Sequence, residues 1–239
     1  MKNILLLAFL LLSVSTNAQG LQGLLKKATN IMSEQGAGLS SQDIANGLKE
    51  ALTIGAEKGC VNLSKSDGFF KNAALKILMP PEAQKIENTI RSLGMNQLAD
   101  DFILSMNRAA EDACNTAAPI FVKAIKEMSI TDGINILKGN ETAATTYLKS
   151  KTEMDLKNSF SPIIKTSLDK VDATKYWEKI ITTYNAIPFS KKMNPDLTAY
   201  VTEKSMNGIY SEIASQEKEI RANPMARTSA LLKSVFEKK

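Results

Sequence analysis

The apolar residues between positions 96 and 128 repeat every three to four residues, and this spacing constrains the fold more than any other feature. Such spacing gives a helix one apolar face, so it predicts a long core helix that Pro119 must kink or split. No alternating strand pattern flanked by hairpin turns occurs in the chain. We therefore predict an all-α protein. The repeat consists of Leu98, Phe102, Met106, Ala109, Ala113, Ala117, Ile120 and Ala124.

Start and stop signals predict further helices along the chain. Ser41 is a candidate N-cap, Pro81 fits the first position of the helix 82–93, and Gly94 ends that helix. We expect one bundle-like domain over 39–239, in which two long helices, about 96–128 and 196–222, pack among shorter ones. The shorter helices are expected at 131–138, 141–151, 154–168, 172–187 and 225–236.

The first eighteen residues have the pattern of a signal peptide. Lys2 precedes the apolar run 4–12, and a small residue, Ala18, stands at the expected cleavage point. The run is too short to cross a bilayer. We therefore expect a soluble protein, periplasmic or otherwise exported, with residues 19–38 forming an N-terminal arm.

Composition excludes several kinds of chemistry. The chain has no histidine, which removes imidazole bases, histidine zinc ligands and Ser/His/Asp or Cys/His nucleophile systems. Its net charge of +5 is small, and basic residues are interleaved with acidic ones, so nucleic-acid binding is not predicted. Neither phosphate-binding glycine motif occurs, and no carboxylate-rich loop suggests calcium. We therefore predict no cofactor and no metal.

Two cysteines, Cys60 and Cys114, allow two arrangements. In an exported protein they can form one disulfide. Alternatively, they are buried free thiols on separate helices, because cysteine is often buried unpaired.

The stretch 105–147 holds the first candidate site. Asn107 and Glu111 fall at the edge of the apolar arc, where they form either a hydrogen-bond network that fixes helix register or a ligand site. Arg108 lies on the outer side, where we expect an ion pair with Asp112. Alanines 109, 110, 113, 117 and 118 allow another backbone to approach closely, and Ser205 and Gly208 are candidates for the facing surface.

Downstream of this helix, Gly139 is expected to end a helix in a left-handed conformation, and Asn140 or Thr142 to cap the next. Thr145 and Tyr147 join the candidate site if the fold brings them near Asn107 and Glu111. Asp67 and Asp132, each followed by glycine, are expected to be turn or cap residues.

The C-terminal stretch holds the second candidate site. Arg221 and Arg227 can hold an anion between them. Alternatively, Glu217 and Arg221 form salt bridges that fix the last helix to the body. That helix has an apolar face flanked by basic residues, so membrane contact is an option, but docking on the protein's own core is favoured.

Several ordered motifs resemble a known family. They are N-R-A-A-E (107–111), I-L-x-G (136–139), A-A-T-x-Y (143–147), Y-V-T (200–202) and I-R-x-N-P-x-A-R (220–227). In this order they resemble an exported bacterial family catalogued as domain of unknown function 4197, over roughly 39–236. The resemblance implies an all-helical fold and no established activity. Gly133 departs from the alanine expected there.

Three functions are consistent with the sequence. The leading hypothesis is a non-enzymatic binding or interaction module for an unknown protein or small ligand. The second is an enzyme with Glu111 as base and Tyr147 or Tyr200 as acid. The third is a membrane-surface or envelope-structural protein.

Overall fold

The computed structural model describes residues 40–186, 188, 192–194 and 196–223, and all regular structure in this part of the chain is helical, which confirms the all-α prediction. The predicted signal peptide, N-terminal arm and last helix (225–236) lie outside the described residues. The elements are α2 (Ser41–Ser64), η1 (Pro81–Ala83), α3 (Gln84–Ser92), α4 (Asn96–Cys114), α5 (Ala117–Lys126), α6 (Ile130–Lys138), α7 (Ala143–Asp169), α8 (Ala173–Asn185) and α9 (Leu197–Ala222).

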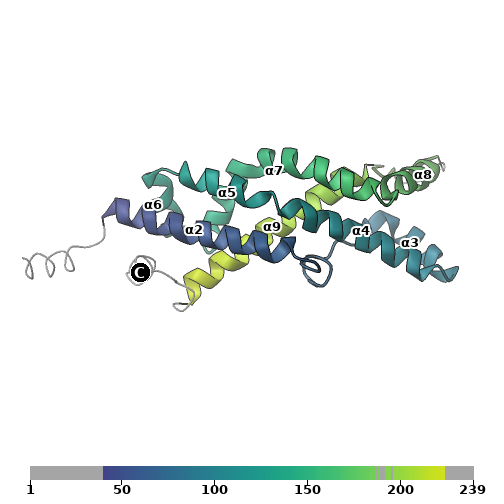
Figure 1. Ribbon diagram of the computed structural model, residues 1–239, viewed down its shortest axis with the longest axis horizontal. Coiled ribbons are helices and arrows are strands. Elements are labelled where there is room, and N and C mark those ends of the chain that lie inside the picture. The colour runs from purple at the N-terminus through teal and green to yellow at the C-terminus, as the bar shows by residue number, and fades with distance from the viewer. Residues whose placement is uncertain (1–39, 187, 189–191, 195, 224–239) are drawn as a thin grey trace, which may run out of the picture. The chain divides into compact units, whose positions relative to one another are not determined.

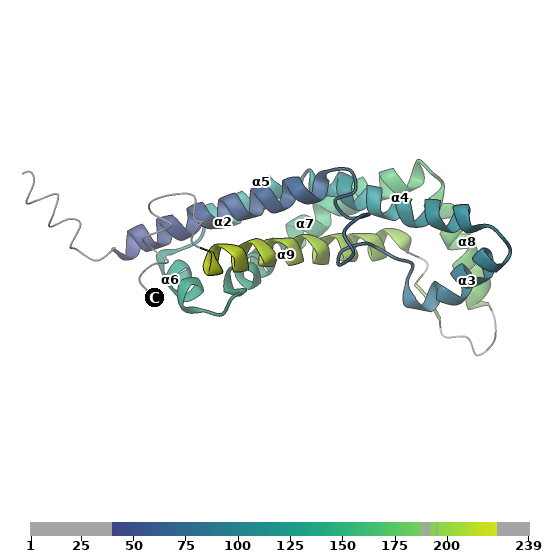
Figure 2. The same cartoon turned by 90° about the horizontal axis from the view of Figure 1, so that it is seen from below.

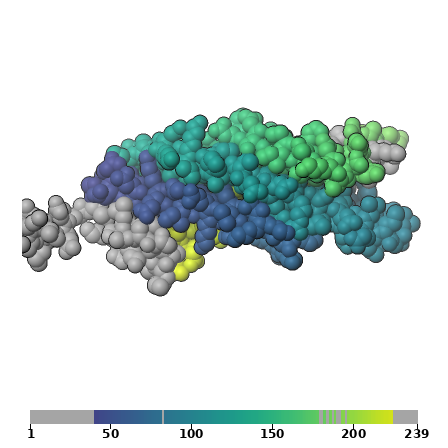
Figure 3. Space-filling view, viewed as in Figure 1, coloured from purple at the N-terminus to yellow at the C-terminus, as the bar shows by residue number. Residues whose placement is uncertain are grey.

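The long helices run lengthwise beside one another, with α3 and α8 at one end and α6 at the other (Figures 1 and 2). Helix α9 packs against α7, α2 and α4, and α7 also packs against α4 and α5. In Figure 3, α2, α4, α5 and α7 cover most of α9. The core between them is built from large side chains with almost no exposure, among them Leu48, Met106, Phe121, Phe160 and Ile209.

The predicted helix 96–128 is two helices in the structure. Helix α4 ends at Cys114, Asn115 and Thr116 form a turn, and α5 begins at Ala117. Pro119 is the third residue of α5 and explains the break. Its ring would clash with the carbonyl of residue 115 in a continuous helix, whereas a first-turn position requires no N–H donor.

The opposite error occurs at 141–168, where two short helices were predicted and α7 is continuous. From Leu148 onward its buried residues recur every four positions: Leu148, Thr152, Leu156, Phe160, Ile164 and Leu168. Thr152 belongs to this stripe and is only 1% exposed, so the apolar pattern was interrupted in the sequence but not in the fold. The second predicted long helix, 196–222, corresponds to α9.

The helix ends follow local chemistry. Ser40, one residue before the predicted cap, and Asp43 form a capping box at the start of α2. Gly94 has φ of 80°, as expected for a left-handed helix stop. Gly139 ends α6, but the predicted left-handed conformation is wrong, because its φ of −73° and ψ of −175° are extended. Glycine is required at position 139 because any other residue would place a Cβ only 2.5 Å from the Cβ of Ala143.

The start of α6 also explains Gly133. Ser129 and Asp132 form a capping box, so Asp132 is a cap residue as predicted. A Cβ on Gly133 would lie 3.3 Å from the Cα of Ala45, which is tighter than an ordinary contact. The glycine therefore allows α6 to pack closely against α2.

Candidate functional site

Asn107 holds the non-helical segment 65–80, which joins α2 to η1. Its Oδ1 accepts a hydrogen bond from the N–H of Ile77 at 2.8 Å, and its Nδ2 donates to the carbonyls of Ile77 at 2.8 Å and Ile103 at 2.7 Å. Asn107 has no exposure. Its amide thus satisfies both backbone groups of Ile77, as a neighbouring strand would.

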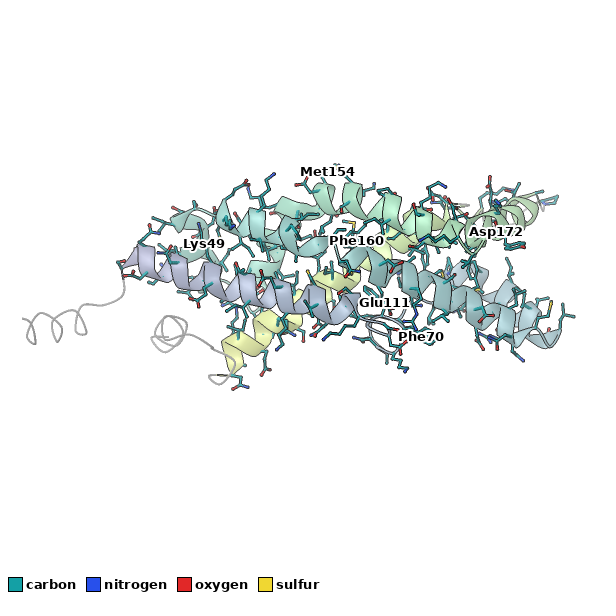
Figure 4. The ribbon with its side chains drawn as sticks, in the orientation of Figure 1. Lys49, Phe70, Glu111, Met154, Phe160 and Asp172 are labelled. Carbon is teal, nitrogen blue, oxygen red and sulfur yellow. The ribbon has the colours of Figure 1, made fainter. Side chains whose placement is uncertain are left out.

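Glu111, one turn further along α4, holds the same segment at a second point. Its Oε1 accepts from the N–H groups of Phe69 at 3.0 Å and Phe70 at 3.2 Å. Its Oε2 accepts from Arg108 Nη1 at 2.6 Å. Figure 4 shows Glu111 close to Phe70. Both carboxylate oxygens are therefore engaged in holding backbone and an arginine of the same helix.

The expected pair of Arg108 with Asp112 is wrong. Arg108 Nη2 instead donates to Asp67 Oδ1 at 2.7 Å, and Asp112 accepts from Ser167 Oγ at 2.8 Å. Asp67 lies in the turn after α2 with φ of 70°, consistent with its predicted turn role. Hydrogen bonds from Lys71 and Arg108 lower the pKa of Asp67. We name Asp67, Asn107, Arg108 and Glu111 the α4 cluster.

A similar arrangement joins α6, α7 and α9. Glu217 accepts from the N–H groups of Ala144 at 3.0 Å and Thr145 at 2.9 Å, and from Thr145 Oγ1 at 2.9 Å. Arg221 Nε donates to Glu217 at 3.0 Å, and its Nη2 donates to the carbonyl of Ile136 at 2.9 Å. Thr145, Glu217 and Arg221 form the α9 cluster.

The α9 cluster places opposite charges at two helix ends. The Glu217 carboxylate meets the first N–H groups of α7, and the Arg221 guanidinium meets the last carbonyls of α6, which matches both helix dipoles. The predicted capping of α7 by Asn140 or Thr142 is therefore wrong. The Thr142 side chain makes no capping bond, and Asn140 Oδ1 accepts from the N–H of Thr142. The predicted salt bridge between Glu217 and Arg221 is present, with Nη2 of Arg221 2.9 Å from Glu217 Oε1. Arg227 and the last helix lie outside the described residues, so neither the anion site nor the fixing of that helix is tested.

The two candidate tyrosines are separate from these clusters. Tyr147 lines a hollow of about 260 Å³ with Glu127, Asp132 and Lys151, and burial is the main cause that raises its pKa. Neither Glu111 nor Tyr200 lines that hollow. The Tyr200 hydroxyl donates to the carbonyl of Leu78 at 2.9 Å, which is a further contact to the segment 65–80. The structure therefore does not assemble the predicted base and acids in one hollow.

Both cysteines are free and buried, Cys60 on α2 and Cys114 on α4. Burial raises the pKa of the Cys60 thiol to about 12, and burial together with the neighbouring Cys60 raises that of Cys114 well above its usual value. The structure thus has the second of the two arrangements considered from the sequence.

The described residues contain neither a group of metal-ligating side chains nor a helix fit to span a membrane. No group of three or more cysteine, aspartate or glutamate side chains in this part of the chain is arranged to hold a metal ion. None of the described helices combines the length and apolar character that crossing a membrane requires.

Sequence reasoning missed an apolar groove between α4 and the turn from α7 to α8. This α4–α8 groove has a volume of about 450 Å³, and its lining is mainly apolar. Leu98, Val171 and Tyr176 line it and are 56%, 55% and 62% exposed. Phe102 also lines it and stacks on Trp177, with ring centroids 5.7 Å apart. Leu98 and Phe102 belong to the apolar repeat of α4, so periodicity alone assigned them to the core.

The fold and the two clusters define a helical bundle in which buried glutamates, each paired with an arginine of the same helix, fix backbone segments and helix ends. The sequence motifs of 107–111, 136–139 and 143–147 supply most of these groups. The family model described as Protein of unknown function (DUF4197) matches residues 38–237, and the chain belongs to this family. No curated protein and no solved structure matches the chain.

Proposed function

We propose that the chain is an exported, non-enzymatic binding protein that accepts an amphipathic helix of a partner protein in the α4–α8 groove. One observation carries this proposal. Three large apolar side chains, Leu98, Val171 and Tyr176, are each more than half exposed around one hollow. Contiguous exposed apolar surface of this kind is typical of interaction sites, whereas single exposed apolar residues are not informative.

The shape of the groove favours a helix as the occupant. Along α4 the lining residues Leu98, Phe102, Ser105 and Ala109 recur every three to four positions, so they form one ridge beside the α7–α8 turn. A groove between two helical walls accepts a third helix through its apolar face. Two acidic and two basic residues also line the groove, so charged residues of either sign can flank that face: Asp101, Asp112, Arg108 and Lys170.

The α4 and α9 clusters support a non-enzymatic role. A general base must reach the proton that it removes. Glu111 and Glu217 instead have both carboxylate oxygens occupied by backbone N–H groups, hydroxyls or arginine. The signal-peptide pattern of the first eighteen residues supports export.

A fluorescence titration tests the proposal. The chain has one tryptophan, Trp177, which stacks on Phe102 of the groove. The titrant is a tryptophan-free Leu/Lys amphipathic peptide of about 18 residues, which is long enough to be helical. Its binding should change the fluorescence emission of Trp177 saturably. Leu98→Lys and Val171→Asp should each weaken binding by roughly tenfold or more, as at a central apolar contact.

Met154→Lys is the matched control, because Met154 is 68% exposed on α7 and lies outside the groove. Figure 4 shows it on the outer side of the bundle. This variant should bind as the unaltered protein does. Absence of saturable binding, or equal binding by the Leu98→Lys and Met154→Lys variants, would overturn the proposal.

A further inference from the structure

A second hollow, the α7–α9 hollow, lies between α7 and the first half of α9 and has a volume of about 400 Å³. It shares no lining residue with the α4–α8 groove. Most of its lining residues carry polar or charged groups. Helix α7 contributes Lys149, Glu153, Lys157 and Ser161, and α9 contributes residues that include Thr202, Glu203, Asn207 and Tyr210.

Thr202, the last residue of the Y-V-T motif, is the unusual member of this lining. It is only 3% exposed, and its Oγ1 has no hydrogen-bond partner among the described residues. Other buried hydroxyls bond the carbonyl four residues earlier, as Thr152 does to Leu148 and Ser205 does to Val201. A buried polar group without a partner is costly, so a hydroxyl left unpaired beside a hollow requires an explanation.

Three charged lining residues of α7 also lack an ion-pair partner among the described residues. Lys149, Glu153 and Lys157 follow one another at four-residue intervals along α7, and in the part of the chain that the structure describes none of them forms an ion pair. Lys149 Nζ lies 5.9 Å from the centroid of the Tyr210 ring. By contrast, Lys165 near the end of α7 is paired with Asp169 at 2.5 Å.

The spacing of these charges defines a ligand class. Four residues of α-helix rise by about 6 Å. Along α7 the Glu153 carboxylate therefore has an ammonium group at about this spacing on each side, from Lys149 and from Lys157. An extended dipeptide places its charged ends roughly 7 Å apart. A single amino acid carries both charges on one carbon and cannot span two of these positions.

We propose that the α7–α9 hollow binds a short zwitterionic peptide of about two residues. Its terminal ammonium binds Glu153, its carboxylate binds Lys157 or Lys149, and its peptide group hydrogen-bonds to the Thr202 hydroxyl. Asn207 and Glu203 offer further polar contacts from the α9 wall. This site is independent of the proposed helix-binding groove, so either proposal can fail without the other.

Amide chemical-shift titrations of the purified protein test the site with four probes: alanylalanine, glycine, acetate and methylammonium. Alanylalanine should shift Glu153, Lys157 and Thr202 saturably, with a Kd on the order of 1 mM. The other three probes should bind at least about tenfold more weakly, because each can satisfy fewer of the groups. No saturable shift with alanylalanine, or acetate binding as tightly as alanylalanine, would overturn the proposal.

Variants separate binding from folding. Glu153→Gln and Lys157→Gln should each weaken alanylalanine binding by roughly tenfold. Lys151→Gln and Asp155→Asn, which alter exposed charges of α7 outside this hollow, should leave it unchanged. Thr202→Val should weaken binding while its melting temperature stays the same or rises, because it removes an unpaired hydroxyl and keeps the shape. Unchanged binding by Thr202→Val, or a lower melting temperature, would contradict the assigned role.

Discussion

At the residue scale, Glu111 is the member of the α4 cluster whose side chain binds both the segment 65–80 and an arginine. Replacing it with alanine leaves the N–H groups of Phe69 and Phe70 without an acceptor and removes a partner of Arg108. We expect Glu111→Ala to lower the free energy of unfolding by about 2–4 kcal/mol. Glu111→Gln should cost less, because the amide oxygen still accepts from backbone. Urea denaturation measures both.

Glu57 provides the matched control for Glu111. It is exposed on α2, so Glu57→Ala should change the free energy of unfolding by no more than about 0.5 kcal/mol. If Glu111→Ala cost no more than Glu57→Ala, the α4 cluster would not stabilise the fold.

The sequence located part of this cluster but not its partners. The helical arc placed Asn107 and Glu111 at the edge of the core, where a polar side chain must find hydrogen bonds. The groups that they bind, at Ile77 and Phe69, are 30 and 42 residues earlier in the chain. Helical periodicity describes only neighbours within a helix, so it paired Arg108 with Asp112 and could not indicate Asp67.

At the element scale, glycines set how closely α9 approaches its neighbours. A Cβ on Gly208 would lie 2.4 Å from Cε1 of the fully buried Phe69 ring. Gly208→Ala should therefore lower the free energy of unfolding by about 1–3 kcal/mol through overpacking, despite the higher helix propensity of alanine. The atoms nearest to this position belong to a ring of the segment 65–80, and α4 also packs against α9.

Gly55→Ala, on α2, is the matched comparison. Its Cβ would lie 3.6 Å from Gln216 Cβ and from Ile220 Cδ1, which are ordinary contacts. At this position the higher helix propensity of alanine should outweigh any packing cost. The free energy of unfolding should therefore rise by about 0.5–1 kcal/mol. Chemical denaturation of both variants checks the opposite signs. A stabilised Gly208→Ala variant would contradict the close packing of Phe69 on α9.

Element boundaries were predicted where the signal is local and were wrong where packing decides them. The helix stop at Gly94 and the start of α9 at Asp196 were predicted correctly, because glycine and aspartate determine the backbone conformation at their own positions. The continuity of α7 depends on Thr152, whose hydroxyl lies 2.9 Å from Tyr210 Oη across the bundle. Thr152 lies between the predicted helices 141–151 and 154–168, and this tertiary partner makes it a core residue of one continuous helix.

At the scale of the whole molecule, the family motifs describe how distant segments are joined. The α4 cluster fixes the segment 65–80 against α4, and the α9 cluster fixes the junction of α6 and α7 against α9. These motif residues are therefore explained by stability. The two hollows share only Arg108 with these clusters, and many of their lining residues are exposed side chains.

Three buried groups make the free energy of unfolding of the whole bundle fall at alkaline pH. Burial is the main cause that raises the pKa of Cys60 and of Tyr210 to about 12, and it raises that of Cys114 further above its usual value. Their ordinary values are 9.0 for the thiols and 10.0 for the phenol. The folded state therefore retains protons that the unfolded state releases.

The sign of the effect follows from this difference. The stabilisation is fully present below pH 9 and is lost as the pH rises from 9 towards 12, because the unfolded chain ionises first. We expect the free energy of unfolding to be nearly constant from pH 7 to 8.5 and to fall by about 1–3 kcal/mol by pH 10. Guanidinium denaturation at each pH measures it, and at pH 8 a thiol reagent should react with neither cysteine until the protein is unfolded. A flat stability profile up to pH 10.5, or immediate thiol reaction in the folded protein, would show that these groups are not buried as the structure places them.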